Sequence, residues 1–281
     1  MAVEKPIPIT VLVQTKNEAL GIEACLRALS EFDEVIVVDS ESSDRTVDIV
    51  RSQGVQLVNF AWDGQYPKKK QWQLDNVATK HDWVLFLDAD ETPDALLKIS
   101  MRKAMEVAPE KLPSAFDIKL DYYFSQQLLK HGHRVQKRAL VNRRRVRFPV
   151  IDDLAAPGMG ELEGHYQPIV EGHVATLRGR LKHEDLDPLR TWFDRHNRYS
   201  DWEAALAIGR SRTADRYRSR QGRLFAAAPL KPLLFFAYSY ILRLGFLDGR
   251  AGFDYAFALS HYYWQIGLKT REGLRQGDRD T

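Results

Sequence analysis

The chain has 281 residues, 44% of them hydrophobic, and a formal net charge of only +3. This length supports one sizeable core with an appendage, and the charge balance alone implies neither a nucleic acid nor a membrane as partner. The single cysteine, Cys25, excludes a disulfide within the chain, and its helical surroundings favour a buried thiol over a nucleophile. Because the N-terminus has no apolar signal region, we expect a cytoplasmic protein.

Strands and helices are expected to alternate in the first part of the chain. The pattern predicts strands over residues 9–15, 34–39, 55–60 and from Trp83, and helices over residues 19–30, 44–53, 68–79 and 93–106. It then predicts longer strands over residues 116–124, 139–148 and 173–183, and it is helical from Asp187 onward. Such alternation is typical of βαβ units in a parallel sheet, to which we expect the later strands to add antiparallel pairs.

Polar clusters follow three of the predicted strands. Residues 15–18 are Thr-Lys-Asn-Glu, residues 39–42 are Asp-Ser-Glu-Ser, and residues 88–91 are Asp-Ala-Asp-Glu. In open α/β sheets the carboxyl ends of the strands border the crevice in which ligands bind. We therefore expect the three clusters to form one site.

The third cluster is a candidate metal site. Asp88 and Asp90 can both reach one divalent cation if the chain leaves strand geometry between them. Hard oxygen ligands of this kind suit Mg²⁺ or Mn²⁺, ions that commonly bridge to a substrate diphosphate. The alternative is a solvated acidic turn, in which Thr92 caps the next helix and Pro93 opens it.

Basic residues form two runs in the first two thirds of the chain. Residues 68–70 are three lysines, which could neutralise phosphates from the first turn of a helix or form a solvated surface. Residues 134–147 carry seven basic residues and no acid. Within this second run, Arg143 or Arg144 could anchor a diphosphate or an anionic acceptor.

A third basic run precedes an apolar segment. Residues 210–223 carry six arginines and one acid, and residues 224–247 are strongly apolar and aromatic. Two prolines and the charged residues Lys231 and Arg243 interrupt the apolar segment, which is too short to span a bilayer. It resembles an interfacial helix on an anionic membrane surface, and the alternative is a helical hairpin packed on the core.

The polar clusters and their strands together resemble family 2 glycosyltransferases of the GT-A fold, and among these the lipopolysaccharide-core β-glycosyltransferase branch. Residues 15–18, 37–46 and 82–91 carry the resemblance by their order and spacing, and residues 236–269 resemble the C-terminal helices of that branch. The resemblance implies an α/β fold in which helices flank a mixed sheet and a C-terminal helical extension follows.

This resemblance also implies a division into domains. We expect a GT-A catalytic domain over residues 1–186 and a helical extension over residues 187–281 that could associate with a membrane. Within the catalytic domain, we expect a nucleotide-binding half over residues 1–115 and an acceptor-side half over residues 116–186.

The family pattern implies a donor site at the strand ends. Asp39 would accept a hydrogen bond from a uracil-type base, Asn17 and Glu18 would hold the nucleoside, and Lys70 would meet a phosphate. The complete donor-binding set that we expect is Thr15, Asn17, Glu18, Asp39, Glu41, Lys70, Asp88 and Arg143.

The same pattern implies a metal site for Mn²⁺ or Mg²⁺. Asp90 would bind the cation directly, and Asp88 would face the ribose or the water shell of the cation. His183 matches the histidine that ends the corresponding strand in the family, where it would approach the metal or the diphosphate. The alternative for His183 is a purely structural histidine.

The resemblance also implies that the anomeric carbon is inverted in a single displacement, which requires a general base on the acceptor hydroxyl. The branch usually has a His-Glu pair, and the matching positions here are His165 and Tyr166, so the glutamate is missing. The nearest carboxylates are Glu163, our first candidate, and Glu161, our second, and His165 has a suitable ordinary pKa. The alternative is that this glycine-rich acidic loop is simply solvated.

The sequence therefore predicts a metal-dependent inverting glycosyltransferase. It would move a sugar from a nucleotide diphosphate, with UDP as the expected nucleotide, to a lipid-linked or cell-envelope glycan at the inner face of the cytoplasmic membrane. The competing hypothesis is a Mg²⁺-dependent phosphatase of the haloacid-dehalogenase type that uses Asp88 and Asp90, but three predicted strands precede the motif. No dinucleotide fingerprint and no nucleic-acid-binding motif is recognisable.

Overall fold

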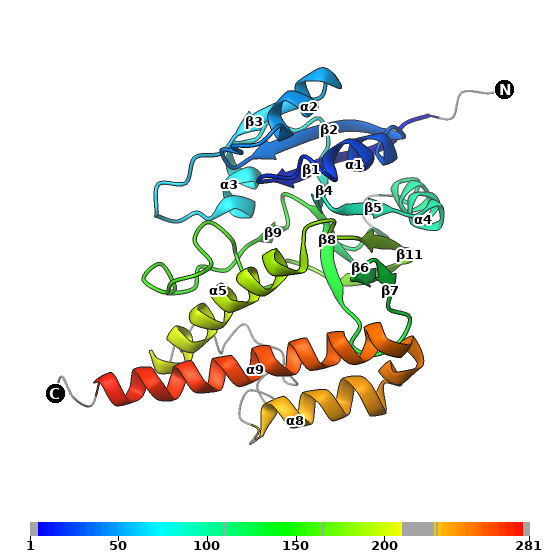
Figure 1. Ribbon diagram of the computed structural model, residues 1–281. Helices are drawn as coiled ribbons and strands as arrows, with labels where there is room; N and C mark the ends of the chain where they lie inside the picture. Colours follow the sequence, from blue (N-terminus) through cyan, green and yellow to red (C-terminus); the bar gives the residue numbers. More distant parts are fainter. Residues whose placement is uncertain (1–4, 109–110, 165, 210–227, 229, 278–281) are drawn as a thin grey trace.

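The computed structural model describes residues 5–108, 111–164, 166–209, 228 and 230–277 (Figure 1). Its centre is a mixed sheet with the strand order β3-β2-β1-β4-β8-β6-β11-β5. The strands on this path are β1 (Ile7–Thr15), β2 (Phe32–Asp39), β3 (Gln56–Asn59), β4 (Trp83–Asp88), β5 (Glu91–Pro93), β6 (Ala115–Phe124), β8 (Gln136–Asn142) and β11 (Val174–His183). Strand β7 (Gln127–Leu128) pairs with β6 alone.

The four strands from β3 to β4 are parallel neighbours, as the βαβ pattern predicts. Helices cover both faces of this part of the sheet. Val11 and Val13 of β1 point to one face, where they pack with α1 (Ile22–Ala28), α2 (Thr46–Ser52) and α4 (Ala95–Met105). Leu12 points to the other face and packs with α3 (Lys69–Asn76). Because both faces are covered, the strands are continuous hydrophobic runs.

Cys25 lies in α1, where it is buried in the core between this helix and the sheet. Burial raises the pKa of its thiol well above the ordinary value. The prediction of a buried core thiol is confirmed.

The turn after β4 differs from the predicted helix start. Residues 91–93 form β5, which pairs antiparallel with β11, and Glu91 is buried. Helix α4 begins at Ala95, because the Asp94 carboxylate accepts a hydrogen bond from the backbone N–H of Leu97 at 2.6 Å. The alternative in which Thr92 caps the helix and Pro93 opens it is therefore wrong.

The later strands extend the sheet with both parallel and antiparallel pairs. Strand β8 is antiparallel to both β4 and β6, as predicted, whereas β6 and β11 are parallel. The single strand predicted over residues 139–148 is two strands, because a turn separates β8 from β9 (Val146–Arg147). Strand β9 pairs with β10 (Ile169–Val170) in a separate ribbon.

Helices form the C-terminal part, as predicted. They are α5 (Leu189–Ile208), α8 (Lys231–Phe236), the π-helix η2 (Ala237–Leu242), the 3₁₀ helix η3 (Gly245–Asp248) and α9 (Gly249–Gly277). In Figure 1, α8 and α9 lie side by side below the sheet, and α5 crosses between them and the sheet. Tyr255 of α9 and Trp192 of α5 share a small core with Phe124 of β6.

Among the described residues, none of the helices is both long and apolar enough to cross a membrane. The basic run over residues 210–223 and the start of the apolar segment lie outside the described residues. The division into domains stays a prediction.

Candidate active site

The carboxyl ends of β1, β2 and β4 meet at one edge of the sheet. Thr15 is in register with Asp39, and Gln14 with Asp88. The Thr15 hydroxyl donates a hydrogen bond to Asp39 Oδ1 at 2.8 Å. The parallel register therefore brings together the polar strand ends that the sequence singled out.

Asp39 is buried and held in one orientation. Its Oδ2 accepts from the backbone N–H of Ser42 at 2.8 Å, and its Oδ1 accepts from the Ser42 hydroxyl at 2.5 Å. The Ser42 hydroxyl in turn accepts from the backbone N–H of Asn17 at 2.8 Å, and Asn17 Oδ1 accepts from the backbone N–H of Ser43. Asn17 and Glu41 both adopt left-handed backbone conformations, with φ of 60° and 56°. The loops after β1 and β2 are therefore tied to each other around Asp39.

The three lysines of residues 68–70 have different environments. Lys68 is buried in an ion pair with Asp153 at 2.8 Å. Lys69 is also buried, its Nζ donates to the carbonyl of Thr15 at 3.2 Å, and burial lowers its pKa to about 8 against the opposing effect of nearby carboxylates. Lys70 is partly exposed, and its charge acts on Asp88. Lys69 and Lys70 thus face the acidic edge, and the sequence selected only Lys70.

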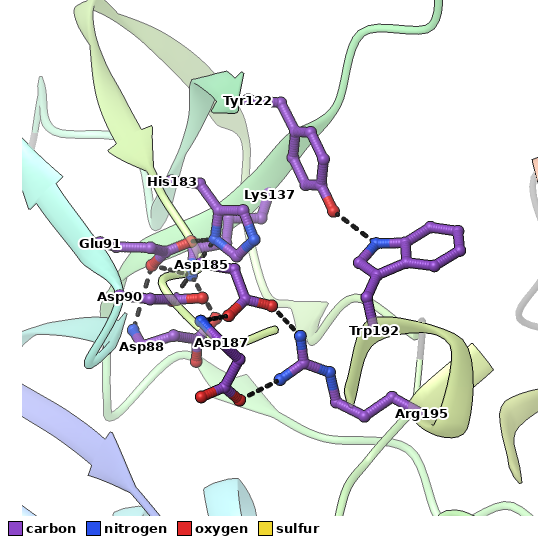
Figure 2. A network of polar contacts seen from close by, with 10 residues as sticks. All are labelled: Asp88, Asp90, Glu91, Tyr122, Lys137, His183, Asp185, Asp187, Trp192 and Arg195. Atoms are coloured by element: carbon purple, nitrogen blue, oxygen red, sulfur yellow. Dashed lines mark hydrogen bonds and ion pairs between the residues drawn. The ribbon is translucent and has the colours of Figure 1, made fainter. Parts of the chain in front are cut away.

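An acidic cluster lies directly after β4 (Figure 2). The Lys137 ammonium donates to Asp88 Oδ2 at 3.0 Å and to Glu91 Oε2, which also accepts from the backbone N–H of Asp88. Leu140 of β8 pairs with Leu85 of β4, so the antiparallel register places Lys137 level with Asp88. The strand pairing therefore supplies the cation that holds two of the carboxylates.

Charge in this cluster is distributed unevenly. Burial raises the pKa of Asp88, but Lys137 and Lys70 outweigh it and hold this pKa below its usual range. Burial, followed by Asp88 and Glu91, raises the pKa of Asp90 to about 6 against the opposing effect of His183. The two aspartates of the motif therefore bind protons very differently.

His183 and Glu18 face Asp90 from other elements. Burial lowers the pKa of His183, but Asp90 and Glu91 outweigh it and raise this pKa to about 9. Burial raises the pKa of Glu18 to about 8, with a further contribution from Asp90. Near neutral pH, His183 is thus protonated and Glu18 carries its proton.

Three buried polar atoms in this cluster have no hydrogen-bond partner. They are Asp90 Oδ1, Glu91 Oε1 and His183 Nδ1, and the last lies 3.4 Å from the first and 3.6 Å from the second. Two carboxylate oxygens and an imidazole nitrogen are a donor set that a divalent cation can use. Within the described residues, no group of three or more His, Cys, Asp or Glu side chains is already arranged as a metal cage.

Residues from β6 and α5 complete the surroundings of the cluster (Figure 2). Tyr122 stacks on His183 with ring centroids 4.9 Å apart, and its hydroxyl accepts from Trp192 Nε1 at 3.3 Å. Arg195 forms ion pairs with Asp185 and, at 3.5 Å, with Asp187. The sequence did not identify Lys137, Tyr122 or Arg195, because each is distant along the chain and carries no local motif.

The two described candidates for the general base, Glu163 and Glu161, have different polar contacts. Glu163 is buried, and its Oε1 accepts from the backbone N–H groups of Lys70 and Gln71 in the first turn of α3. Burial raises its pKa. The Glu161 carboxylate lies 4.0 Å from Lys16 Nζ, at the end of β1. His165 lies outside the described residues.

A cavity of about 290 Å³ borders Glu163 on the side of Lys68 and Asp153. Asp88, Asp90 and His183 are not among its lining residues. The cavity and the acidic cluster are therefore at different places in the described structure.

Arg143 does not join the other predicted donor-binding residues. It follows Asn142, which pairs with Trp83 at the beginning of β4, so it lies at the edge of the sheet opposite Asp88. Its guanidinium donates to the carbonyls of Leu74 and Val77 at the end of α3. The structure thus gives Arg143 a helix-capping position far from the acidic edge.

Comparisons with known proteins agree with this architecture. Residues 10–146 match the family model described as Glycosyl transferase family 2. An uncharacterized glycosyltransferase of Rickettsia bellii is 43% identical over 84 residues, which are 30% of this chain and 28% of that protein. The matched part spans 28 to 29% of the length of five Rickettsia relatives.

One relative matches along almost the whole chain. The lipopolysaccharide core biosynthesis glycosyltransferase LpsC of Rhizobium meliloti is 24% identical over 282 residues, which cover 95% of this chain and 96% of LpsC.

Among solved structures, glucosyl-3-phosphoglycerate synthase of Mycobacterium tuberculosis, in complex with Mn²⁺, UDP and phosphoglyceric acid, gives a TM-score of 0.42 at 16% identity. The match covers 71% of this chain and 78% of that chain. S. aureus TarS 1–349 gives a TM-score of 0.40 at 14% identity and covers 92% of each chain. At these TM-scores the overlap carries no argument about function.

The mixed sheet, with helices on both of its faces and an acidic pair after β4, is the GT-A fold. Residues 10–146 thus match the model of glycosyl transferase family 2, and the similarity to the lipopolysaccharide-core glycosyltransferase LpsC extends along almost the whole chain. The competing phosphatase hypothesis finds no support in these matches.

Proposed function

We propose that the protein transfers a sugar, with inversion, from a nucleotide diphosphate to a lipid-linked or cell-envelope glycan. The observation that carries the proposal is the acidic cluster of Asp88, Asp90 and His183 beside the fixed carboxylate of Asp39. The similarity to LpsC supports an acceptor of the lipopolysaccharide-core type. Such an acceptor would place the reaction at the inner face of the cytoplasmic membrane.

The donor site is proposed to take UDP. A carboxylate can accept about four hydrogen bonds, and the three that Asp39 receives leave room for the imide N–H of uracil. Thr15 and Asn17 hold the surrounding loops, and Glu18 and Glu41 line the same edge of the sheet. Lys69 and Lys70, beside Asp39 and Asp88, are placed to meet the diphosphate.

Mn²⁺ or Mg²⁺ is proposed as the cofactor, held directly by Asp90 and supported by Asp88 and His183. When bound, the cation would neutralise charge that develops on the leaving diphosphate. The Asp88 carboxylate is 45% exposed, so a ligand can reach it, whereas Asp90 is mostly enclosed. Lys137 keeps the Asp88 and Glu91 carboxylates in place before any ligand arrives.

A carboxylate is proposed as the general base that takes the proton of the acceptor hydroxyl. Glu163 stays our first candidate from the sequence, with Glu161 and His165 after it. The structure adds Asp187, whose pKa is raised by burial and by Asp185 and whose charge acts on Glu18. A raised pKa favours proton abstraction near neutral pH.

Turnover against a panel of nucleotide sugars, scored by release of the nucleoside diphosphate with Mg²⁺ or Mn²⁺, tests the proposal. We expect release with a UDP-sugar, and we expect Asp90→Ala to reduce it by about 100-fold or more. Asp48→Asn, at an exposed position of α2, is the matched control. Full activity of Asp90→Ala in the presence of EDTA would reject the mechanism.

A further inference from the structure

The C-terminal helices carry a broad surface of exposed apolar side chains. Its members, which we call the apolar face, are Leu230, Leu233, Leu234, Tyr238, Ile241, Leu242, Leu244, Phe246, Leu247, Phe253, Phe257, Trp264 and Leu268. Contiguous exposed apolar surface of this extent marks an interaction site in soluble proteins.

Helix α9 has apolar side chains on two opposite sides. Tyr255 and Ala258 are buried against Phe124 of β6. Phe253 and Phe257 each lie two positions from Tyr255, which is about 200° around a helix. They therefore point away from the domain, where Phe257 is 59% exposed. Phe253 contacts α8 and η2 on this second apolar side of α9, and Phe257 is left exposed.

The exposed side chains of α8, η2 and α9 form one continuous surface. The ring of Phe253 contacts the rings of Phe236 and Tyr240, with centroids 5.8 and 5.6 Å apart, and stacks on Phe257 at 5.9 Å. In Figure 1, α8 runs beside α9 on the side away from the sheet. The two helices thus present their apolar residues as a single layer.

The charges around the apolar face are predominantly basic. Between Leu230 and Leu247 the charged residues are Lys231 and Arg243. Of the acids that follow, Asp248 is buried beside His131 at 3.0 Å, and Asp254 forms an ion pair with Arg250 at 2.9 Å. The basic run over residues 210–223 precedes this segment in the sequence. An anionic surface complements this charge.

We propose that the apolar face docks on the surface of a bilayer that contains anionic phospholipids. Its leucine and aromatic side chains would enter the boundary between headgroups and acyl chains, with Arg243 at the level of the phosphates. Tyr238 lies under the Arg243 guanidinium, 5.9 Å from the ring centroid, and aromatic rings of this kind favour the membrane interface. A symmetric dimer through the same face is less suited, because it would oppose identical basic groups.

Helix α9 contacts the candidate active site through the side that is opposite the apolar face. Tyr255, on the buried side of α9, packs on Tyr122 at 5.1 Å, and Tyr122 stacks on His183. The apolar face and the acidic cluster therefore lie on opposite sides of α9, so docking would hold a lipid-linked acceptor near the candidate active site. This last step rests on the proposed function, whereas the docking itself does not.

Vesicle flotation of the full chain tests the docking without donor, acceptor or metal. We expect binding to phosphatidylcholine vesicles that contain about 30% phosphatidylglycerol to exceed binding to pure phosphatidylcholine by about tenfold, and to weaken in high salt. The double variant Ile241→Glu/Phe257→Glu should lower binding by about tenfold. The matched control, Leu96→Glu/Ile99→Glu on α4, changes apolar side chains that are 52% and 50% exposed and should bind as the parent does.

A second variant, Arg243→Ser, leaves the apolar residues in place and should selectively weaken binding to the anionic vesicles. The inference is overturned if the parent protein does not float with anionic vesicles, or if the α4 control loses as much binding as the double glutamate variant. It is also overturned if sedimentation equilibrium shows a dimer that the double glutamate variant dissociates. Loss of flotation with intact nucleotide release would leave the proposed reaction standing, and the reverse result would leave the docking standing.

Discussion

His183 Nδ1 lies 3.4 Å from Asp90 Oδ1, and both atoms are buried without a hydrogen-bond partner. The pKa of Asp90 is about 6 and that of His183 about 9, so both groups are charged at neutral pH. A cation that entered here would require the carboxylate form of Asp90, and the neutral form of His183 if the imidazole is a ligand.

The pH dependence of Mg²⁺ binding follows from these values. We expect affinity to rise by about tenfold per pH unit below pH 6, because Asp90 must lose its proton. If His183 is a ligand, the affinity for Mg²⁺ continues to rise up to about pH 9. If it is not, the affinity levels off once the pH exceeds the pKa of Asp90. Titration calorimetry at a series of pH values checks this, and binding that stays constant between about pH 5 and 7 would exclude Asp90 as a ligand.

Asp90→Asn is expected to stabilise the metal-free fold while it removes activity. The folded-state pKa of Asp90 is raised from 3.8 to about 6, so the native state favours the protonated carboxyl. The stability that the protonated Asp90 carboxyl contributes is fully present below pH 3.8. It is lost as the pH rises through about 6, because the buried carboxylate form destabilises the folded state. The variant should gain about 1–2 kcal/mol in free energy of unfolding near pH 8 and nothing near pH 4.

Urea unfolding with EDTA present measures this difference. Asp48→Asn, outside the cluster, should change the unfolding free energy little at either pH. A loss of stability in Asp90→Asn near pH 8 would show that the Asp90 carboxylate is net favourable to the fold.

Lys137→Met is expected to destabilise the protein strongly. Lys137 neutralises Asp88 and the buried Glu91, and its removal leaves a carboxylate uncompensated in the interior. Breaking a buried ion pair from one side typically costs about 3 kcal/mol or more. Denaturant unfolding checks this, with Lys137→Arg as the control that keeps the charge. An unchanged midpoint for Lys137→Met would mean that the ion pairs contribute nothing net.

The sequence predicted the parallel half of the fold well, because its strands are covered on both faces. Continuous hydrophobic runs such as residues 83–87 have few alternatives to a buried strand, and three of these strands end in polar clusters. Very short strands such as β5 and β9 carry no periodic signal, since pairing with a distant partner defines them. The helix start at Ala95 was missed for that reason.

The site was only partly predictable because strand direction and register are not local properties. Asp39, Asp88 and Asp90 follow buried strands, and the predicted parallel order of these strands brings Asp39 and Asp88 to one edge of the sheet. Arg143 was placed with them, but antiparallel β8 carries it to the opposite edge. The same register delivers Lys137 to Asp88, which no motif in the basic run indicates.

The variants Glu163→Gln and Asp187→Asn test which of these two carboxylates is the general base. Gln at position 163 can still accept the two backbone N–H groups that start α3, so its fold should be unchanged. The variant that lacks the base should lose about 100-fold or more in kcat at neutral pH with an unchanged KM for the donor. Single-turnover kinetics of both variants checks this, and full activity in both would direct attention to Glu161 and His165.

The central claim is that Asp90 and Asp88 position a cation that contacts the diphosphate of the donor. Its most direct test is the crystal structure with UDP and Mn²⁺, in which anomalous scattering locates the metal. We predict a Mn²⁺ peak about 2.1 Å from an Asp90 oxygen and from the diphosphate, with uracil at Asp39. A nucleotide bound elsewhere, with both aspartates free of metal, would contradict the account.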